Sequence, residues 1–260
     1  MLENLGKSVV LTGSMIPLEE PVSDAKRNLL VSMMVTAHLN ITEVMIFFNT
    51  KLIRGNRARK ADLWNISAIE SSNMEPLAIM GVGIHVHLKN LLHPPIHQFH
   101  VHTNLFTSII VLHITPCFCF TFLQHIAFTW KQYLSEAPAI VLLLYGSGNG
   151  PVTTTPFVEI VQTCINNGCT IVIMTQCHIG SVDLTQYEAG RVLSKLGVID
   201  GKDMTVEACV TKLSYLMGHN IRGQKLKYVM ETNLRGELSR RSIVSYTGYA
   251  LGRSGYLTKL

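Results

Sequence analysis

Short apolar runs alternate with longer amphipathic stretches along most of the chain. Runs of β-branched and aliphatic residues, 4–8 long, are typical of buried strands. The chain has five such runs, at 8–14, 43–49, 108–114, 139–146 and 170–177. The run "AIVLLLYG" (139–146) has no polar interruption, which suits a parallel sheet covered on both faces.

The stretches between these runs show helical spacing. Residues 23–39 carry a stripe of apolar residues at positions 29, 30, 33, 34 and 37. Ser23 or Asp24 can cap this helix by accepting hydrogen bonds from free backbone N–H groups. Further helices are predicted at 154–167, at 187–196, and at 206–217 with Thr205 as its cap.

The alternation of strands and helices predicts an α/β protein with parallel sheets flanked by helices. We expect an N-terminal domain, a His- and Pro-rich linker, a C-terminal domain and a tail without clear periodicity, at residues 1–84, 85–106, 107–238 and 239–260. Ligands of such sheets bind beyond the carboxyl ends of the strands. The candidate sites are therefore the segments 12–14, 49–60, 146–151 and 175–180.

The segment after the second predicted strand is basic, with cations at positions 51, 54, 57, 59 and 60. A lysine near a buried strand end among other cations favours its neutral amine, so Lys60 is a candidate base. The competing interpretation is an ordinary solvated surface. We expect Arg54 and Arg57 to be structural hydrogen-bond donors. The net charge is +5, but residues 94–149 contain a single Lys or Arg, Lys131. This uneven distribution argues against nucleic-acid binding.

Several other site types are not favoured. Six histidines lie between positions 85 and 102, but no cysteine or carboxylate accompanies them, so we expect no metal. "GSGNGP" (146–151) lacks the spacing of a phosphate-binding loop, so we expect no nucleotide cofactor. The six cysteines form no C-x-x-C pair, which predicts reduced thiols and a cytoplasmic location.

The stretch 105–128 is apolar enough to raise the possibility of a membrane span. Its interior carries His113, Pro116, Gln124 and His125, which are costly or helix-breaking in a bilayer. We expect instead a buried strand, a turn and a packed helix, and hence no membrane association.

Ser14 and Cys177 each follow a predicted strand and are candidate nucleophiles. No G-x-S-x-G elbow surrounds Ser14. Cys177 has the neighbour His178 but no further catalytic pattern. Local patterns therefore leave the nucleophile unassigned.

Four stretches together resemble the cytosolic type I L-asparaginases, including the animal enzymes that carry a lysophospholipase name. They are "VVLTGSMIPLEEPVSDAKRNLL", "FFNTKLIRGNRARKAD", "YGSGNGP" and "GVIDGKDMTVEACVTKLSYLMG". The resemblance covers residues 1–238. It implies a two-domain asparaginase-like fold and hydrolysis of L-asparagine to L-aspartate and ammonia, without metal or cofactor.

The resemblance also implies roles for single residues. Lys60 matches the catalytic lysine. Asn149 matches a residue that a neighbouring subunit contributes to substrate binding, which implies a homo-oligomer, and we assign Ser14 to substrate binding as well. Cys177 matches a position linked to effector binding in some bacterial members, although Arg59 replaces a threonine of that site.

The chain also departs from the family pattern. The nucleophilic threonine of a T-G-G-T-I-like segment does not occur, and neither does an H-G-T-D-T-M-like segment. "MLENLGK" matches the residues that come directly after the second segment in the family, so we expect the first part of the N-terminal domain to be missing and the chain alone to be inactive. The alternative is a non-catalytic partner that pairs with an intact paralogue. Lysophospholipid hydrolysis and nucleic-acid binding rank below these two.

Overall fold

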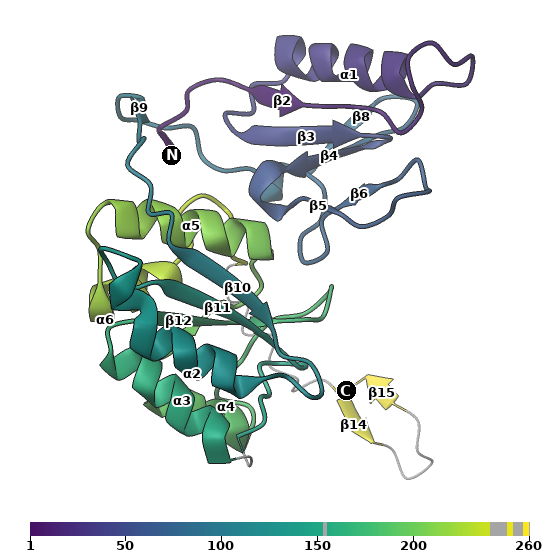
Figure 1. Ribbon diagram of the computed structural model, residues 1–260. Coiled ribbons are helices and arrows are strands. Elements are labelled where there is room, and N and C mark those ends of the chain that lie inside the picture. Colours follow the sequence, from purple (N-terminus) through teal and green to yellow (C-terminus); the bar gives the residue numbers. More distant parts are fainter. Residues whose placement is uncertain (153–154, 240–248, 252–256, 260) are drawn as a thin grey trace.

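The chain folds into two α/β domains joined by an extended segment (Figure 1). The computed structural model describes residues 1–152, 155–239, 249–251 and 257–259. Most of the predicted tail therefore lies outside the described residues. The exceptions are Ser239 and two short strands, β14 (Tyr249–Leu251) and β15 (Leu257–Lys259), which pair antiparallel.

The N-terminal domain is built on a five-stranded sheet of order β2-β3-β4-β7-β8. Its elements are β2 (Val9–Leu11), α1 (Ala25–His38), β3 (Val44–Phe48), β4 (Lys51–Arg54), the 3-10 helix η1 (Gly55–Arg57), β7 (Ala78–Met80) and β8 (Ile84–Val86). β5 (Arg59–Lys60) and β6 (Ile69–Glu70) form a separate hairpin.

Parallel pairing in this sheet is limited to β2 and β3, and the other pairs are antiparallel. Short connections explain two of the three antiparallel pairs, β3 with β4 and β7 with β8. Only Asn49 and Thr50 separate β3 from β4, and a parallel neighbour needs a crossover of a dozen or more residues. Asn49 has a φ of 56°, as a tight hairpin turn requires.

Helix α1 forms where predicted, but its apolar stripe faces solvent. The side that packs on the sheet carries Asn28, Val31, Ser32 and Val35. The residues of the predicted stripe are 45–60% exposed: Leu29, Leu30, Met33 and Met34. The sequence predicted the stripe but not which side of the helix packs on the sheet, because apolar residues occupy both sides of α1 and periodicity alone cannot choose between them.

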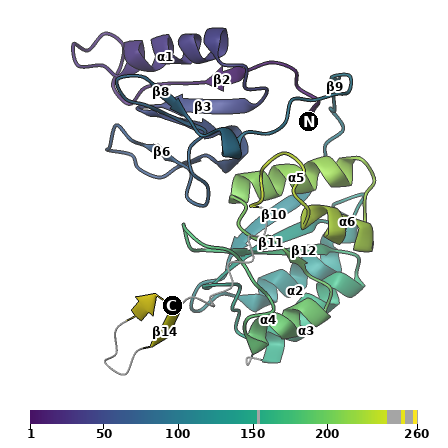
Figure 2. The ribbon, with the colours of Figure 1, turned by 180° about the vertical axis from the view of Figure 1, so that it is seen from behind.

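The C-terminal domain has a four-stranded sheet of order β10-β11-β12-β13, and every pair in it is parallel. Its elements are β10 (Ile109–His113), α2 (Phe120–Thr129), the 3-10 helix η3 (Trp130–Gln132), β11 (Ala139–Leu144), α3 (Thr155–Asn166), β12 (Thr170–Thr175), α4 (Glu188–Lys195), β13 (Ile199–Asp200), α5 (Val206–Gly218) and α6 (Gly223–Met230). Helices α2, α3 and α4 cover one face, and α5 and α6 cover the other (Figures 1 and 2).

Strand β11 shows why this domain was predictable. All six of its residues are buried, and they alternate between two hydrophobic clusters. Ile140, Leu142 and Leu144 pack toward α2 and α3, whereas Val141 and Leu143 pack toward α5 and α6. The apolar stretch 105–128 is divided between β10 and α2, and no helix in the described part of the chain is long and apolar enough to cross a membrane.

The connection between the domains carries more structure than expected. β8 crosses the predicted domain boundary at residue 84, and a 3-10 helix, η2 (Leu88–Asn90), follows it. β9 (His100–Val101) pairs antiparallel with β1 (Leu2–Glu3) at the start of the chain. The N-terminus therefore lies beside the linker, above α5 (Figure 1).

Candidate active site

Lys60 lies on the short strand β5, where it pairs with Ile69 of β6. The side chain is exposed, and its Nζ lies 3.7 Å from Met15 Sδ. Within the described residues this thioether is its one hydrogen-bonding partner. The amine thus reaches the loop that follows β2, but from a solvated position rather than from an enclosed cleft, and its catalytic role stays a prediction.

The loop that meets Lys60, residues 12–16, is held in place from α1. The Asp24 carboxylate accepts hydrogen bonds from the backbone N–H groups of Met15, at 3.1 Å, and Ile16, at 3.0 Å. The buried Asn28 amide donates to the Gly13 carbonyl at 2.8 Å. Asp24 was predicted as a possible helix cap, so its loop-bracing role was missed. Ser14 is exposed at the tip of this loop, and no hydrogen bond joins it to Lys60 in the described part of the chain.

Asn149 lies in the turn after β11, in the C-terminal domain. Its backbone N–H donates to the Tyr145 carbonyl at 2.7 Å, and the Tyr145 N–H donates to the Asn149 carbonyl at 3.0 Å. Gly148 has a φ of +106°, and a Cβ there would lie 3.0 Å from Val182, so glycine is needed for this turn. Among the described residues, no hydrogen bond or ion pair links Asn149 to Lys60 or Ser14. The role of each of these three residues stays a prediction.

Cys177 follows β12 and lies at the junction of the two domains. It is exposed and lines a small cavity of about 20 Å³ together with Arg57, Arg59, Thr175, His178 and Asp203. His178 of this segment contacts the N-terminal domain, with Nε2 2.9 Å from Ser72 Oγ. The cavity is sized for about one water molecule, so an effector at Cys177 would need these side chains to move.

The basic segment is not a continuous charged patch. Arg54 and Arg57 are buried, whereas Lys60 is exposed. Arg54 Nη2 lies 2.9 Å from Glu43 Oε1, and Arg57 Nη1 lies 2.8 Å from Asp203 Oδ2. Both arginines are therefore structural, as predicted, and the pair formed by Arg57 and Asp203 ties η1 to the C-terminal domain.

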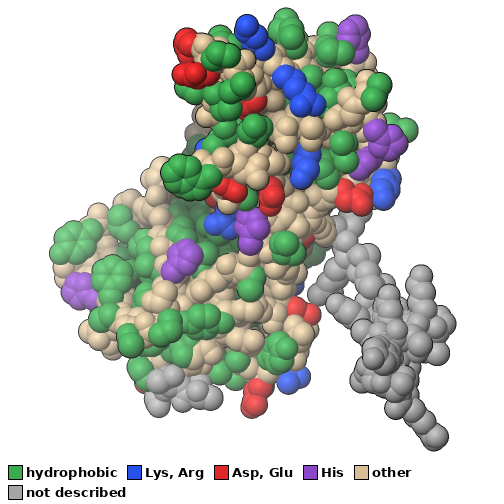
Figure 3. Space-filling view, turned by 90° about the vertical axis from the view of Figure 1, so that its right-hand side faces the viewer, with side chains coloured by type: hydrophobic (Ala, Val, Ile, Leu, Met, Phe, Trp, Pro, Cys, Tyr) green, Lys and Arg blue, Asp and Glu red, His purple; other side chains and the backbone are tan. Residues whose placement is uncertain are grey.

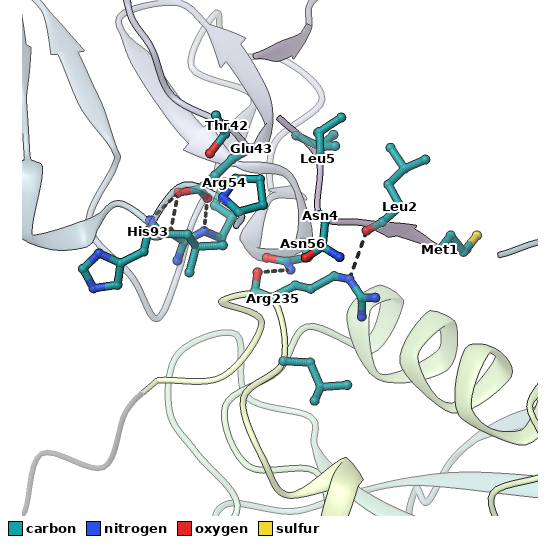
Figure 4. A pocket seen from close by; sticks show the side chains of 14 residues that line it. Met1, Leu2, Asn4, Leu5, Thr42, Glu43, Arg54, Asn56, His93 and Arg235 are labelled. Atoms are coloured by element: carbon teal, nitrogen blue, oxygen red, sulfur yellow. Dashed lines mark hydrogen bonds and ion pairs between the residues drawn. The ribbon is translucent and has the colours of Figure 1, made fainter. Parts of the chain in front are cut away.

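A larger cavity of about 450 Å³ lies where the start of the chain meets both domains (Figure 4). Its wall combines apolar side chains such as Leu2 and Leu5 with the Arg235 side chain. Asn56 donates to the Arg235 carbonyl at 2.9 Å, while its buried Oδ1 has no partner. The sequence did not reveal this cavity, because five segments far apart along the chain build it. A separate hollow with hydrophobic side chains lies between the domains on the side facing away from the N-terminus (Figure 3).

The histidines of the linker do not form a metal centre. In the part of the chain that the structure describes, no group of three or more His, Cys, Asp or Glu side chains is arranged to hold a metal ion. His85 and His87 instead pack edge to face, with ring centroids 5.2 Å apart.

Comparison with known proteins places these features in a family. The N-terminal asparaginase family matches residues 1–92, and the glutaminase/asparaginase C-terminal domain matches residues 117–230. L-asparaginase 1 of Escherichia coli K12 is 38% identical over 244 residues, which cover 92% of this chain and 69% of that protein. The chain belongs to the asparaginase family.

Two further relatives are considerably longer than this chain. An L-asparaginase of Dirofilaria immitis is 37% identical over 218 residues, and the human 60 kDa lysophospholipase is 35% identical over 222 residues. Both matches cover 84% of this chain but only 36% and 37% of those proteins. This asparaginase-family chain thus spans little more than a third of their length.

Solved structures confirm the two-domain fold. L-asparaginase I of Vibrio cholerae superimposes with a TM-score of 0.82 at 36% identity, and it covers 92% of this chain and 70% of its own. The thermostable L-asparaginase of Thermococcus kodakarensis gives 0.83 at 31% identity, with the same coverage. The resemblance inferred from four short stretches therefore extends over nearly the whole chain.

Proposed function

We propose that this chain carries part of an amidohydrolase site for L-asparagine, which is hydrolysed to L-aspartate and ammonia. The observation that carries the proposal is the Lys60 amine beside the braced loop 12–16. Membership in the asparaginase family supports amide hydrolysis as the reaction class. The six free cysteines are compatible with a cytoplasmic protein, and we propose that location.

The reaction needs a hydroxyl nucleophile in addition to Lys60. The amine would take a proton from that hydroxyl, the oxygen would attack the side-chain carbonyl of asparagine, and ammonia would leave with a returned proton. Water would then hydrolyse the acyl-enzyme. Met15 Sδ, the present contact of Lys60, has no proton to lose, and the two threonine motifs are not in the sequence. We therefore propose that the chain alone turns over little or no asparagine.

Ammonia release from L-asparagine by the purified chain tests both parts of this proposal. We expect no turnover above that of a heat-denatured sample. Lys60→Met and the control Lys225→Met, at an exposed position on α6, would be assayed in parallel. Sustained turnover that Lys60→Met abolishes would support the site but refute the inactivity. Turnover that Lys60→Met leaves unchanged would refute the role of Lys60.

A second candidate is a non-catalytic partner of an intact asparaginase. The exposed stripe of α1, formed by Leu29, Leu30, Met33 and Met34, favours it, because exposed apolar patches often mark protein interfaces. We expect co-elution with an intact paralogue, lost in the double variant Leu30→Glu/Met34→Glu and kept in Lys225→Glu. Separate elution of the unmodified chain would refute this candidate.

A further inference from the structure

Two histidines from distant parts of the chain meet where the linker contacts α5. His102 follows β9 and His219 ends α5, and His219 Nε2 lies 3.1 Å from His102 Nδ1. Each outer nitrogen also has a partner: His102 Nε2 lies 2.6 Å from Glu3 Oε2, and His219 Nδ1 lies 2.8 Å from the Tyr215 carbonyl oxygen. We call His102 and His219 together the His102–His219 pair.

The outer contacts determine which nitrogens carry hydrogen. A backbone carbonyl can only accept, so His219 Nδ1 must donate to Tyr215. The hydrogen bond from His102 lowers the pKa of Glu3, which is therefore an ionised acceptor at neutral pH, and His102 Nε2 must donate to it. In neutral imidazoles the two remaining nitrogens, which face each other, would then both be lone-pair acceptors.

Two lone pairs at 3.1 Å repel each other unless a cation lies between them. A proton taken up from solvent removes the conflict, because one ring becomes an imidazolium that donates to the other. We propose that the His102–His219 pair binds one shared proton and that this proton closes a pH-sensitive latch between the linker and the C-terminal domain.

The surrounding charges support a single positive charge at this place. The Glu3 carboxylate of β1 touches His102 directly. The opposing cation is Arg235, whose Nε donates to the Leu2 carbonyl and whose guanidinium lies over the Tyr215 ring at 4.9 Å. Tyr215 packs against both histidines, so the Arg235 charge opposes proton uptake and the Glu3 carboxylate favours it. The other groups near Glu3 are the Met1 amine, whose pKa is lowered by burial and by Arg235, and the His100 side chain on β9.

A metal ion fits the gap less well than a proton. Zinc sites in proteins use three or four protein ligands. In the described residues no third His, Cys, Asp or Glu converges with the two facing nitrogens. Metal-bound histidines also donate their second ring N–H to a carboxylate or a carbonyl, as both rings do here. The experiment must therefore distinguish a bound metal ion from a shared proton.

The contact between the two histidines lies beside the first residues of the chain. The backbone N–H of His102 donates to the Met1 carbonyl at 2.8 Å, and β1 pairs with β9 next to it. Met1 and Leu2 also line the 450 Å³ cavity (Figure 4). Opening of the His102–His219 pair would therefore loosen the segment that closes this cavity on one side.

The direction of the pH effect is set by proton counting. The closed pair holds one proton more than an open pair of neutral rings, so the closed-to-open ratio falls by up to ten-fold per pH unit as the pH rises. In acid, a second proton places N–H groups on both facing nitrogens, and Glu3 also becomes neutral, so the latch opens again. We expect maximal closure at an intermediate pH.

Imidazole nitrogen NMR spectra of the whole chain test the protonation pattern directly. We expect hydrogen on His219 Nδ1 and His102 Nε2 and one further proton shared between the facing nitrogens. Hydrogen exchange of the His102 amide, corrected for the intrinsic rate, gives a second readout. Its protection should fall by up to ten-fold per pH unit above the optimum.

His219→Gln provides the decisive variant. A glutamine amide can donate to His102 Nδ1 without an added proton, so we expect the contact to persist and its pH dependence to disappear. His125→Gln, at an exposed position on α2, should keep the dependence of the unmodified chain. Independent titration of His102 and His219 without a shared proton would overturn the proposal. So would loss of the shared signal on addition of a chelator, which would identify a metal in its place.

Discussion

The two domains both combine a sheet with helices, but they differ in how much apolar surface they bury around the sheet. The C-terminal sheet has a hydrophobic cluster on each face, and β11 is buried throughout. The N-terminal domain has one such cluster, and its α1 leaves four large apolar residues exposed. It also contains a buried ion pair between Arg54 and Glu43. The C-terminal domain has a buried pair too, Lys212 with Glu237, but adds it to two clusters. Stability should therefore depend more on apolar packing in the C-terminal domain and more on charge pairing in the N-terminal one.

Breaking the Arg54–Glu43 pair should have the largest effect. Arg54→Leu leaves the Glu43 carboxylate, 2% exposed, buried without its partner, and we expect a loss of about 3–5 kcal/mol in the free energy of unfolding. Glu43 would keep only the Leu92 N–H as a donor. Urea unfolding followed by circular dichroism measures the change.

The double variant Arg54→Leu/Glu43→Leu is the matched control, because it removes both charges. It should recover much of the loss, since replacing both partners by apolar residues is often close to neutral. A double variant as unstable as the single one would show that packing, not charge pairing, dominates at this site.

Truncating a β11 side chain should have the next largest effect. Leu142→Ala removes a fully buried side chain from the C-terminal core, and we expect a loss of about 2–5 kcal/mol. Trp130 follows α2 and packs against the same cluster, so its fluorescence reports this domain once Trp64→Phe removes the other tryptophan.

Leu30→Ala on α1 is the counterpart in the N-terminal domain. The Leu30 side chain is 60% exposed, so we expect a change within about 0.5 kcal/mol. A loss as large as that of Leu142→Ala would show that the α1 stripe is covered in solution, which would favour self-association.

Acid should weaken the contact of the C-terminal domain with the segment after α6. Glu237 and Lys212 form a buried pair at 2.7 Å. Burial alone raises the pKa of Glu237, but the Lys212 charge and hydrogen bonds from Lys212, Leu234 and Arg235 outweigh it, so the net pKa is lowered. Because the pKa of Glu237 is lower in the folded than in the unfolded protein, its ionised form stabilises the fold at a pH above the unfolded-state pKa. This stability is lost as the pH falls through the folded-state pKa.

Glu237→Gln should therefore flatten the acid side of the stability profile, below about pH 4.5. Glu136→Gln is a matched control, because its carboxylate pairs with Arg222 at the surface. The measurement is the free energy of unfolding as a function of pH. If the loss of stability in acid is the same in Glu237→Gln as in the unmodified chain, other carboxylates cause it.

The same contrast explains how much of the fold could be predicted. β11, β12 and α5 were predicted because long apolar runs, helical spacing and the Thr205 cap act locally; the Thr205 side chain does accept a hydrogen bond from the Ala208 N–H. β4, β7 and β8 were missed because each has only three or four residues, and their pairing depends on partners elsewhere in the chain. β4, for example, begins with Lys51 and ends with Arg54, so it contains no apolar run that could be detected.

The candidate site was predictable only in outline. The segments 12–14 and 49–60 were singled out because each follows a predicted strand, and the roles of their residues stay predictions. The carboxylate that braces the loop 12–16 could not be placed. A side chain at a helix start can bond its own helix or a distant loop, and Asp24 does the second. The histidine contact between residues 102 and 219 was equally out of reach, because it depends on how the linker meets α5.

The smallest effects concern the cysteines, which the structure divides into two groups. Burial raises the pKa of the Cys164 and Cys209 thiols to about 12 and that of Cys169 to about 11, so these three should not react with a thiol reagent in the folded protein. The exposed cysteines should react: Cys117, Cys119 and Cys177. Cys177→Ser should reduce the reactive count at pH 8 by one and leave unfolding unchanged within about 0.5 kcal/mol, because this side chain has no buried contact to lose. Reaction of all six thiols before unfolding would mean that the C-terminal core opens readily, and the contrast between a packed and a charge-paired domain would fail.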